Sequence, residues 1–127
     1  MDKPKKDSEE MIALADQIKS KIKSLEAMRS ELRERAERKA NAISGYDRIL
    51  TSVIMKLNNG KEMTHDDESV KDPAKSILIQ IAKGICHAER LELELADAMY
   101  KALISNIEVV KAQLNGLQSI NKHLNEN

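Results

Sequence analysis

The segment LNNGKEMTHDDESVKDPA, residues 57–74, decides the fold because it contains the signals that end one helix and begin another. Gly60 follows two asparagines, and these residue types accept the left-handed conformation in which helices commonly end. Asp72 can cap the start of a helix, and Pro73 then falls at the first helical position, where its missing N–H costs nothing. A chain with this segment near its middle can fold back on itself.

Two helical patterns of 52 residues each, 8–59 and 73–124, lie on either side of an acidic connector at 60–72. Within each pattern, apolar residues recur at intervals of three and four, as in a coiled coil, and twelve of the fourteen positions are apolar. The first series is Met11, Ala15, Ile18, Ile22, Leu25, Arg29, Leu32, Ala36, Lys39, Ile43, Tyr46, Leu50, Val53 and Leu57. The second series is Leu78, Ile81, Ile85, Ala88, Glu92, Leu95, Met99, Leu103, Ile107, Val110, Leu114, Leu117, Asn121 and Leu124.

These patterns predict an all-α protein built as a long antiparallel helical hairpin that resembles a coiled coil. Folding the two series onto each other in reverse order pairs the following residues: Leu57 with Leu78, Leu32 with Leu103, and Met11 with Leu124. The alternative is a three-helix bundle, because a glycine costs about 1 kcal/mol in a helix interior and Gly45 could break the first helix.

Length and composition suggest one helical domain over residues 1–127. A basic flexible tail at 1–7 precedes the first helix. The chain is 33% charged and 41% apolar, without an apolar run long enough for a membrane span or a signal peptide. We therefore expect a cytoplasmic protein that does not enter the membrane. The single cysteine, Cys86, fits a reducing compartment.

The second helical pattern carries more apolar residues than a hairpin seam needs. Leu91, Ala98 and Ala102 widen the seam, and a further stripe consists of Ile79, Ala82, Cys86, Leu93, Ala96, Tyr100 and Ile104. We expect this stripe to form an interface through Ile79, Cys86, Leu93, Tyr100 and Ile104. The predicted partner is a second copy, giving a dimeric four-helix bundle, or another helical protein. The function that follows is a non-enzymatic coiled-coil interaction or assembly protein.

Polar residues interrupt both seams at a few positions. Lys39 and Glu92 fall one layer apart in the closed hairpin, where they can pair and set the alignment of the helices, or Lys39 can extend its charged end to solvent at the edge of the bundle. Arg29 lies beside the layer of Ile107, where it can bond Asn106 or extend its charged end to solvent over an apolar stem.

A basic stretch of the first helix suggests an alternative function. Residues 19–39 carry eight basic and four acidic side chains, which could neutralise phosphates of a nucleic acid. The candidate contact residues are Lys19, Lys23, Arg33, Arg35 and Arg38. The stretch contains no aromatic residue for stacking on bases, so this binding would not depend strongly on sequence.

Residues with catalytic chemistry are few. Glu89, Glu92, Glu94 and Asp97 can bind Mg²⁺ as carboxylates, and the pattern faintly resembles that of all-α nucleoside triphosphate pyrophosphohydrolases. Those enzymes use acidic pairs from separate helices, whereas these four residues crowd one helix and point in different directions. His65 lies in the connector without a second ligand pair. We therefore predict no catalytic, cofactor-binding or metal-binding residues.

Overall fold

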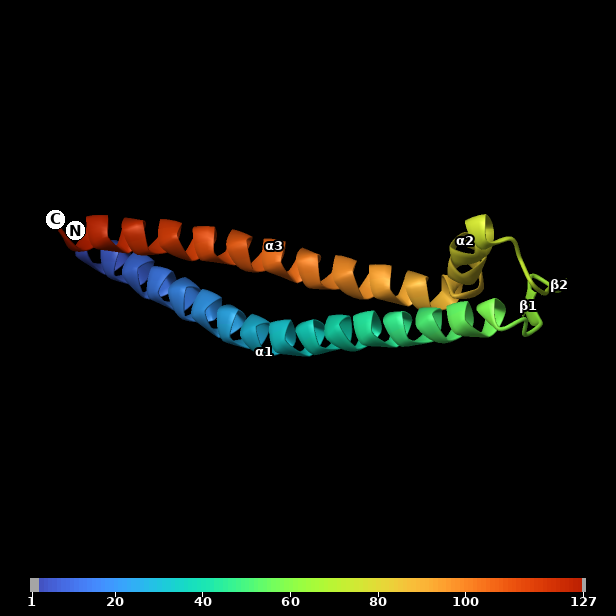
Figure 1. The fold of residues 1–127 in the computed structure, drawn as a ribbon. Coiled ribbons are helices and arrows are strands. Elements are labelled where there is room, and N and C mark those ends of the chain that lie inside the picture. The colour runs from blue at the N-terminus through green and yellow to red at the C-terminus, as the bar shows by residue number, and fades with distance from the viewer. Residues whose placement is uncertain (1–2, 127) are drawn as a thin grey trace. The chain divides into compact units, whose positions relative to one another are not determined.

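The computed structural model describes residues 3–126, in which the chain forms three helices and one two-stranded sheet (Figure 1). The elements in chain order are α1 (Lys3–Asn58), β1 (Met63–His65), β2 (Glu68–Val70), α2 (Lys75–Ile85) and α3 (His87–Asn125). Helix accounts for 85% of the described residues, and the long helices α1 and α3 pack against each other. The all-α helical hairpin predicted from the heptad patterns is confirmed.

Contacts group the chain into two compact units. Unit 1 consists of residues 1–34 and 101–127, and thus of the first part of α1 with the last part of α3. Unit 2 consists of residues 35–100, which include the rest of α1, the sheet, α2 and the first turns of α3.

Helix α1 continues through Gly45, so the predicted alternative with a break at this residue is wrong. The glycine is exposed, and a Cβ added to it would have no neighbouring side chain or distant backbone within 4 Å. Just beyond it, Tyr46 and Val53 are buried on the side of α1 that packs in the core. This packing outweighs the cost of about 1 kcal/mol that a glycine adds to a helix.

The start of α1 differs from the sequence prediction. The backbone of residues 3–7 is helical, whereas these residues were predicted as part of a flexible tail. The rest of that predicted tail, Met1 and Asp2, lies outside the described residues.

The end of α1 has the hydrogen bonds of a Schellman motif. The Lys61 amide donates to the Lys56 carbonyl at 2.9 Å, and the Gly60 amide donates to the Leu57 carbonyl at 3.2 Å. Gly60 has a φ of +80°, a conformation that favours glycine. The helix end predicted from the asparagines and this glycine is therefore confirmed to within one residue.

The acidic connector forms a β-hairpin, which the sequence analysis did not predict. Strands β1 and β2 are antiparallel, and the pair His65–Glu68 closes a two-residue turn made by Asp66 and Asp67. Both turn residues have positive φ, 48° and 64°, as in the type I′ turns that suit the twist of a hairpin. Aspartate tolerates this conformation better than most residues other than glycine and asparagine.

The second helical pattern begins two residues later than predicted. Asp72 has a φ of 50° and turns the chain, and the N-cap residue of α2 is Ala74, which makes no side-chain capping bond. The prediction that Asp72 caps a helix starting at Pro73 is therefore wrong.

The predicted helix over residues 73–124 is interrupted at Cys86, where α2 turns away from the line of α3 (Figure 1). The Cys86 amide still donates to the Ala82 carbonyl, and the Cys86 carbonyl accepts from the Arg90 amide, both at 3.0 Å. The turn has a packing reason, because it lets α2 and the start of α3 bury side chains in one core.

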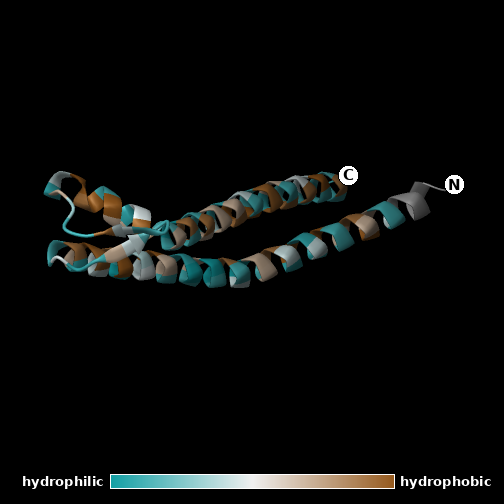
Figure 2. Ribbon diagram, turned by 90° about the vertical axis from the view of Figure 1, so that its right-hand side faces the viewer, coloured by the Kyte–Doolittle hydropathy of each residue, from teal (hydrophilic) through white to brown (hydrophobic). Residues whose placement is uncertain are grey.

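The hydrophobic core of unit 2 lies where α1, the sheet, α2 and the start of α3 meet. Its buried residues are Tyr46, Val53, Leu57, Leu78, Ala82 and Cys86. Leu57 and Leu78, which were predicted to face each other, belong to this same cluster. Figure 2 shows apolar residues along α2 and in the last turns of α1.

Candidate interaction surface

One side of α3 is packed inside the chain, and we call it the inner face. Its residues are buried or half-buried and recur at strict intervals of three and four. Counted from Cys86, which immediately precedes α3, they are Glu89, Leu93, Ala96, Tyr100, Leu103, Ile107, Val110, Leu114, Leu117 and Asn121. This spacing keeps one side of a helix continuously against its neighbour.

The predicted seam differs from the inner face between residues 88 and 99. Ala88, Glu92 and Leu95 were placed in the seam but are exposed, Leu95 by 60%. The predicted series needed three successive four-residue steps from Leu95 onward, whereas the inner face keeps its alternation by using Ala96 and Tyr100. The inner face therefore keeps one regular spacing along α3, without the change of period in the predicted series.

The five predicted interface residues are divided between the inside and the surface. Cys86 is completely buried in the core, and Leu93 and Tyr100 are half-buried on the inner face. Only Ile79 and Ile104 are exposed, by 54% and 38%. Most of the stripe predicted to meet a partner is thus covered by the chain itself.

The packed side of α1 also differs from its predicted series. Ile22 and Ile43 are each 40% exposed and Arg29 is exposed, whereas Lys21, Met28 and Arg35 are half-buried. Two of the polar residues at packed positions, Lys21 and Arg35, make hydrogen bonds to α3. In unit 1, Lys21 Nζ donates to Gln113 Oε1 at 2.8 Å. In unit 2, Arg35 Nη1 donates to the Met99 carbonyl at 2.6 Å.

Lys39 pairs with Asp97 rather than with the predicted Glu92. Its Nζ lies 2.9 Å from Asp97 Oδ1 and 4.8 Å from the centre of the Tyr100 ring. Glu92 is exposed and is not one of the inner-face residues. The prediction that Lys39 makes an interhelical ion pair had the right cation and the wrong partner.

The opposite side of α3 is exposed and uncharged, and we call it the outer face. It has the same strict spacing of three and four residues along this one continuous helix. Its residues are Ala88, Leu91, Leu95, Ala98, Ala102, Ser105, Val109, Ala112, Gly116 and Ser119. Leu91 and Val109 are 58% and 55% exposed. A surface helix normally carries charges on the side away from its core, so α3 is unusual in being apolar on two sides.

A shallow hollow of about 380 Å³ adjoins the outer face where α2 meets α3. Its lining residues are Lys83, Gly84, His87, Arg90, Leu91 and Glu94. Arg90 Nε lies 3.1 Å from Glu94 Oε1, and its guanidinium stands 5.9 Å from the centre of the Tyr46 ring. One leucine of the outer face is therefore set in a partly basic depression.

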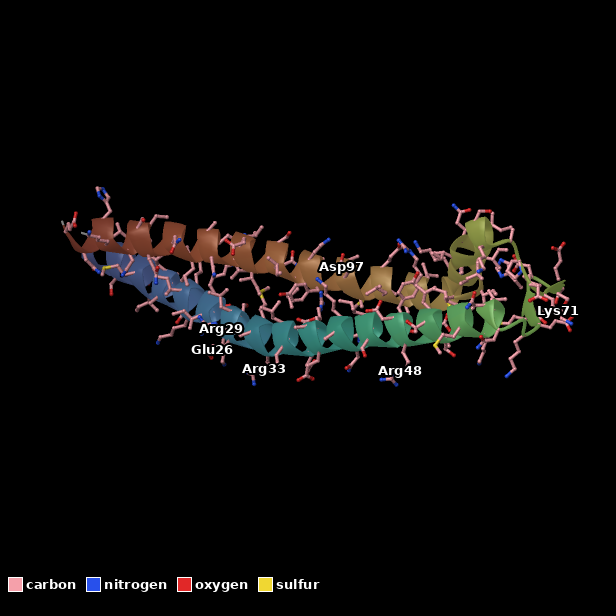
Figure 3. The ribbon with its side chains drawn as sticks, in the orientation of Figure 1. Glu26, Arg29, Arg33, Arg48, Lys71 and Asp97 are labelled. Carbon is pink, nitrogen blue, oxygen red and sulfur yellow. The ribbon has the colours of Figure 1, made fainter. Side chains whose placement is uncertain are left out.

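Four of the five candidate nucleic-acid residues are exposed, and one is half-buried. Lys19, Lys23, Arg33 and Arg38 are exposed, and Figure 3 shows Arg33 on the side of α1 away from α3. Arg35 points to the interior of unit 2 and bonds the Met99 carbonyl. One of the five predicted cations is thus used to hold the helices together.

The acidic residues considered for Mg²⁺ binding are dispersed around α3. Glu89 is half-buried on the inner face, whereas Glu94 and Asp97 pair with Arg90 and Lys39. Among the residues that the structure describes, no group of three or more His, Cys, Asp or Glu side chains is placed to hold a metal ion.

Cys86 lies in the core, where burial and the negative charge of Glu89 raise the pKa of its thiol. A thiol of this kind is protonated and shielded from reagents, so it acts as a small apolar residue. The structure thus assigns Cys86 a packing role.

The helices described, over residues 3–126, include none that is both long and apolar enough to cross a lipid bilayer. Comparison of the chain with protein families, curated proteins and solved structures finds no match.

Proposed function

We propose that this protein is a non-enzymatic coiled-coil assembly protein that binds another helix through the outer face of α3. The observation that carries the proposal is the run of ten exposed, uncharged residues at heptad spacing, in a chain of which 33% is charged. A regular apolar stripe on the surface of a helix is typical of a surface that a second helix covers.

The energetics favour a partner on this face. Burying a leucine completely contributes about 1.5–3 kcal/mol, and Leu91 and Leu95 are more than half exposed. The alanines between them are small, so the backbone of a partner helix can approach closely and pack against both leucines. Helix association of this kind needs no charged or catalytic residue in the contact.

The inner face cannot serve the same purpose, because α1 and the core already occupy it. Leu103 is 2% exposed and Ala96 is 3% exposed, so neither has much surface left for a partner. The proposed interface therefore differs from the stripe predicted from sequence and uses Leu91, Ala98 and Ala102, which were predicted to widen the seam.

The proposal predicts that the double substitution L91E/L95E abolishes partner binding without unfolding the protein. Both side chains are mostly exposed, so the carboxylates remain in water in the separated chain, whereas docking would bury them. The measurement is the recovery of bound proteins, including tagged copies of this chain, from its native source with wild-type and variant bait.

The matched control is N106E/N115E, which adds the same two charges to exposed positions of α3 outside the outer face. We expect the control to keep every partner and the circular dichroism of both variants to equal that of the wild type. Retention of all partners by folded L91E/L95E would refute the proposed function.

A further inference from the structure

We propose that the helix docked on the outer face is α3 of a second copy of this chain, running antiparallel, with Leu95 opposite the partner's Ala98. The inference rests on the proposed function above and names the partner of that surface. Two independent features of α3 favour this alignment, namely the sizes of the outer-face residues and the charges along one edge.

The sizes are complementary in this alignment. With Leu95 opposite the partner's Ala98, Leu91 meets the partner's Ala102 and Ala88 meets the partner's Ser105. A twofold axis repeats every pair, so each large side chain packs against a small residue. The overlap covers residues 88–105, or about 27 Å of helix.

The charges select the same alignment. Glu94 and Lys101 occupy equivalent positions of successive heptads at one edge of the outer face, and Glu108 follows at the next. In antiparallel coiled coils the residues of like edges face each other across the contact and set the alignment of the helices. Here Glu94 faces the partner's Lys101, and symmetry gives the pair twice.

Other alignments bring like charges together. A shift of one heptad in one direction places Lys101 against the partner's Lys101 and Glu94 against the partner's Glu108. A shift in the other direction places Glu94 against the partner's Glu94. A parallel arrangement puts Glu94 beside the partner's Met99 and Lys101 beside the partner's Asn106, so it gains no ion pair from these residues.

The other edge of the outer face raises no objection to the proposed pairing. There Glu92 comes beside the partner's Met99, which is a contact between a carboxylate and a thioether rather than between like charges. Glu94 also pairs with Arg90 within its own chain. In the proposed dimer its carboxylate therefore lies between Arg90 and the partner's Lys101.

The first experiment measures dimerisation of the full chain by sedimentation equilibrium. We expect a dimer at micromolar concentration, and we expect E94K and K101E each to weaken it by about tenfold, because each places two like-charge contacts in the interface. The double variant E94K/K101E should return the dissociation constant to within about twofold of the wild type, since it restores both pairs.

The matched control is K122E, which reverses a charge at the equivalent heptad position but outside residues 88–105. This control should leave the dissociation constant unchanged. If single reversals have no effect, or if the double variant fails to recover, the proposed alignment is wrong.

The second experiment tests the same alignment with disulfides. E94C and K101C chains carrying different tags are mixed under mild oxidation, and mass spectrometry identifies the cross-links. A mixed disulfide between residues 94 and 101 should predominate, whereas a predominant 101–101 or 94–94 product would overturn the alignment. Cys86 is completely buried and should not react.

The two proposals can fail separately. A chain that stays monomeric at high micromolar concentration rejects the second copy as the partner. If L91E/L95E still loses a different bound protein in the recovery experiment, the outer face keeps its proposed function.

Discussion

At the scale of single residues, Cys86 shows how a reactive side chain becomes a structural one. It is completely buried among Leu57, Leu78 and Ala82, and burial and Glu89 raise its pKa. The unfolded chain can ionise this thiol at a lower pH than the folded chain can.

This difference predicts how stability depends on pH. The contribution of Cys86 to the free energy of unfolding is complete below the pKa of an unfolded thiol, about 8.5, and decreases as the pH rises toward the folded pKa. In urea unfolding, the wild type should have a lower free energy of unfolding at about pH 10 than at about pH 7.5. The C86A variant should lack this part of the loss. Equal pH dependence in both proteins would contradict the assignment.

The surroundings of two helical glycines predict different effects of a glycine-to-alanine substitution on the free energy of unfolding. Gly45 has open space around it, so G45A should raise the free energy of unfolding by about 1 kcal/mol. A Cβ at Gly84 would lie 3.2 Å from Nε2 of His65 on β1, so G84A should gain less or lose stability. The absence of a side chain at Gly84 thus leaves room for the imidazole of His65.

Chemical denaturation of G45A, G84A, H65A and G84A/H65A measures these effects. In the H65A background, G84A should recover the gain of about 1 kcal/mol, because the close contact is gone. The same gain in both backgrounds would show that His65 does not restrain residue 84.

At the scale of elements, α3 carries two apolar stripes, and only one of them faces the interior of the chain. The inner face includes Leu103 at 2% exposure, and the outer face includes Leu95 at 60%. Both residues are leucines in the same helix, so truncating each one compares the stability contributed by a buried leucine with that contributed by an exposed leucine.

Truncation of these two leucines should have unequal effects. L103A should lower the free energy of unfolding by about 2–5 kcal/mol, as for other buried leucines. L95A should lower it by less than about 1 kcal/mol when measured at a concentration too low for association. Thermal or urea unfolding provides the measurement, and equal losses would mean that the two faces are wrongly assigned.

At the scale of the whole molecule, the chain combines a closed interior with an open helical face. The core of unit 2 is completed by a β-hairpin and a short helix, which cover the end of α1 with apolar side chains. Within residues 3–126, no equivalent element covers Leu91 and Leu95. The proposed assembly of two copies gives these leucines a partner, and loss of the dimer in L91E/L95E is the result expected at this scale.

Local sequence patterns determined the two long helices, the end of α1 at Asn58 and the reversal of the chain. These features depend on the spacing of apolar residues and on the conformations of a few turn residues, which neighbours in sequence suffice to specify. The equal lengths of the two patterns brought Leu57 and Leu78 together, and both belong to the core of unit 2.

Only the tertiary structure decided which stripe of α3 is covered, where the second helical pattern breaks and which acid Lys39 meets. Both stripes have heptad spacing and apolar residues, so periodicity alone cannot rank them. The choice depends on long-range packing of α1 and α2, because Cys86 and Ala96 must fit against side chains far away in sequence. The same packing turns Asp97 toward Lys39 and leaves Leu91 and Leu95 at the surface.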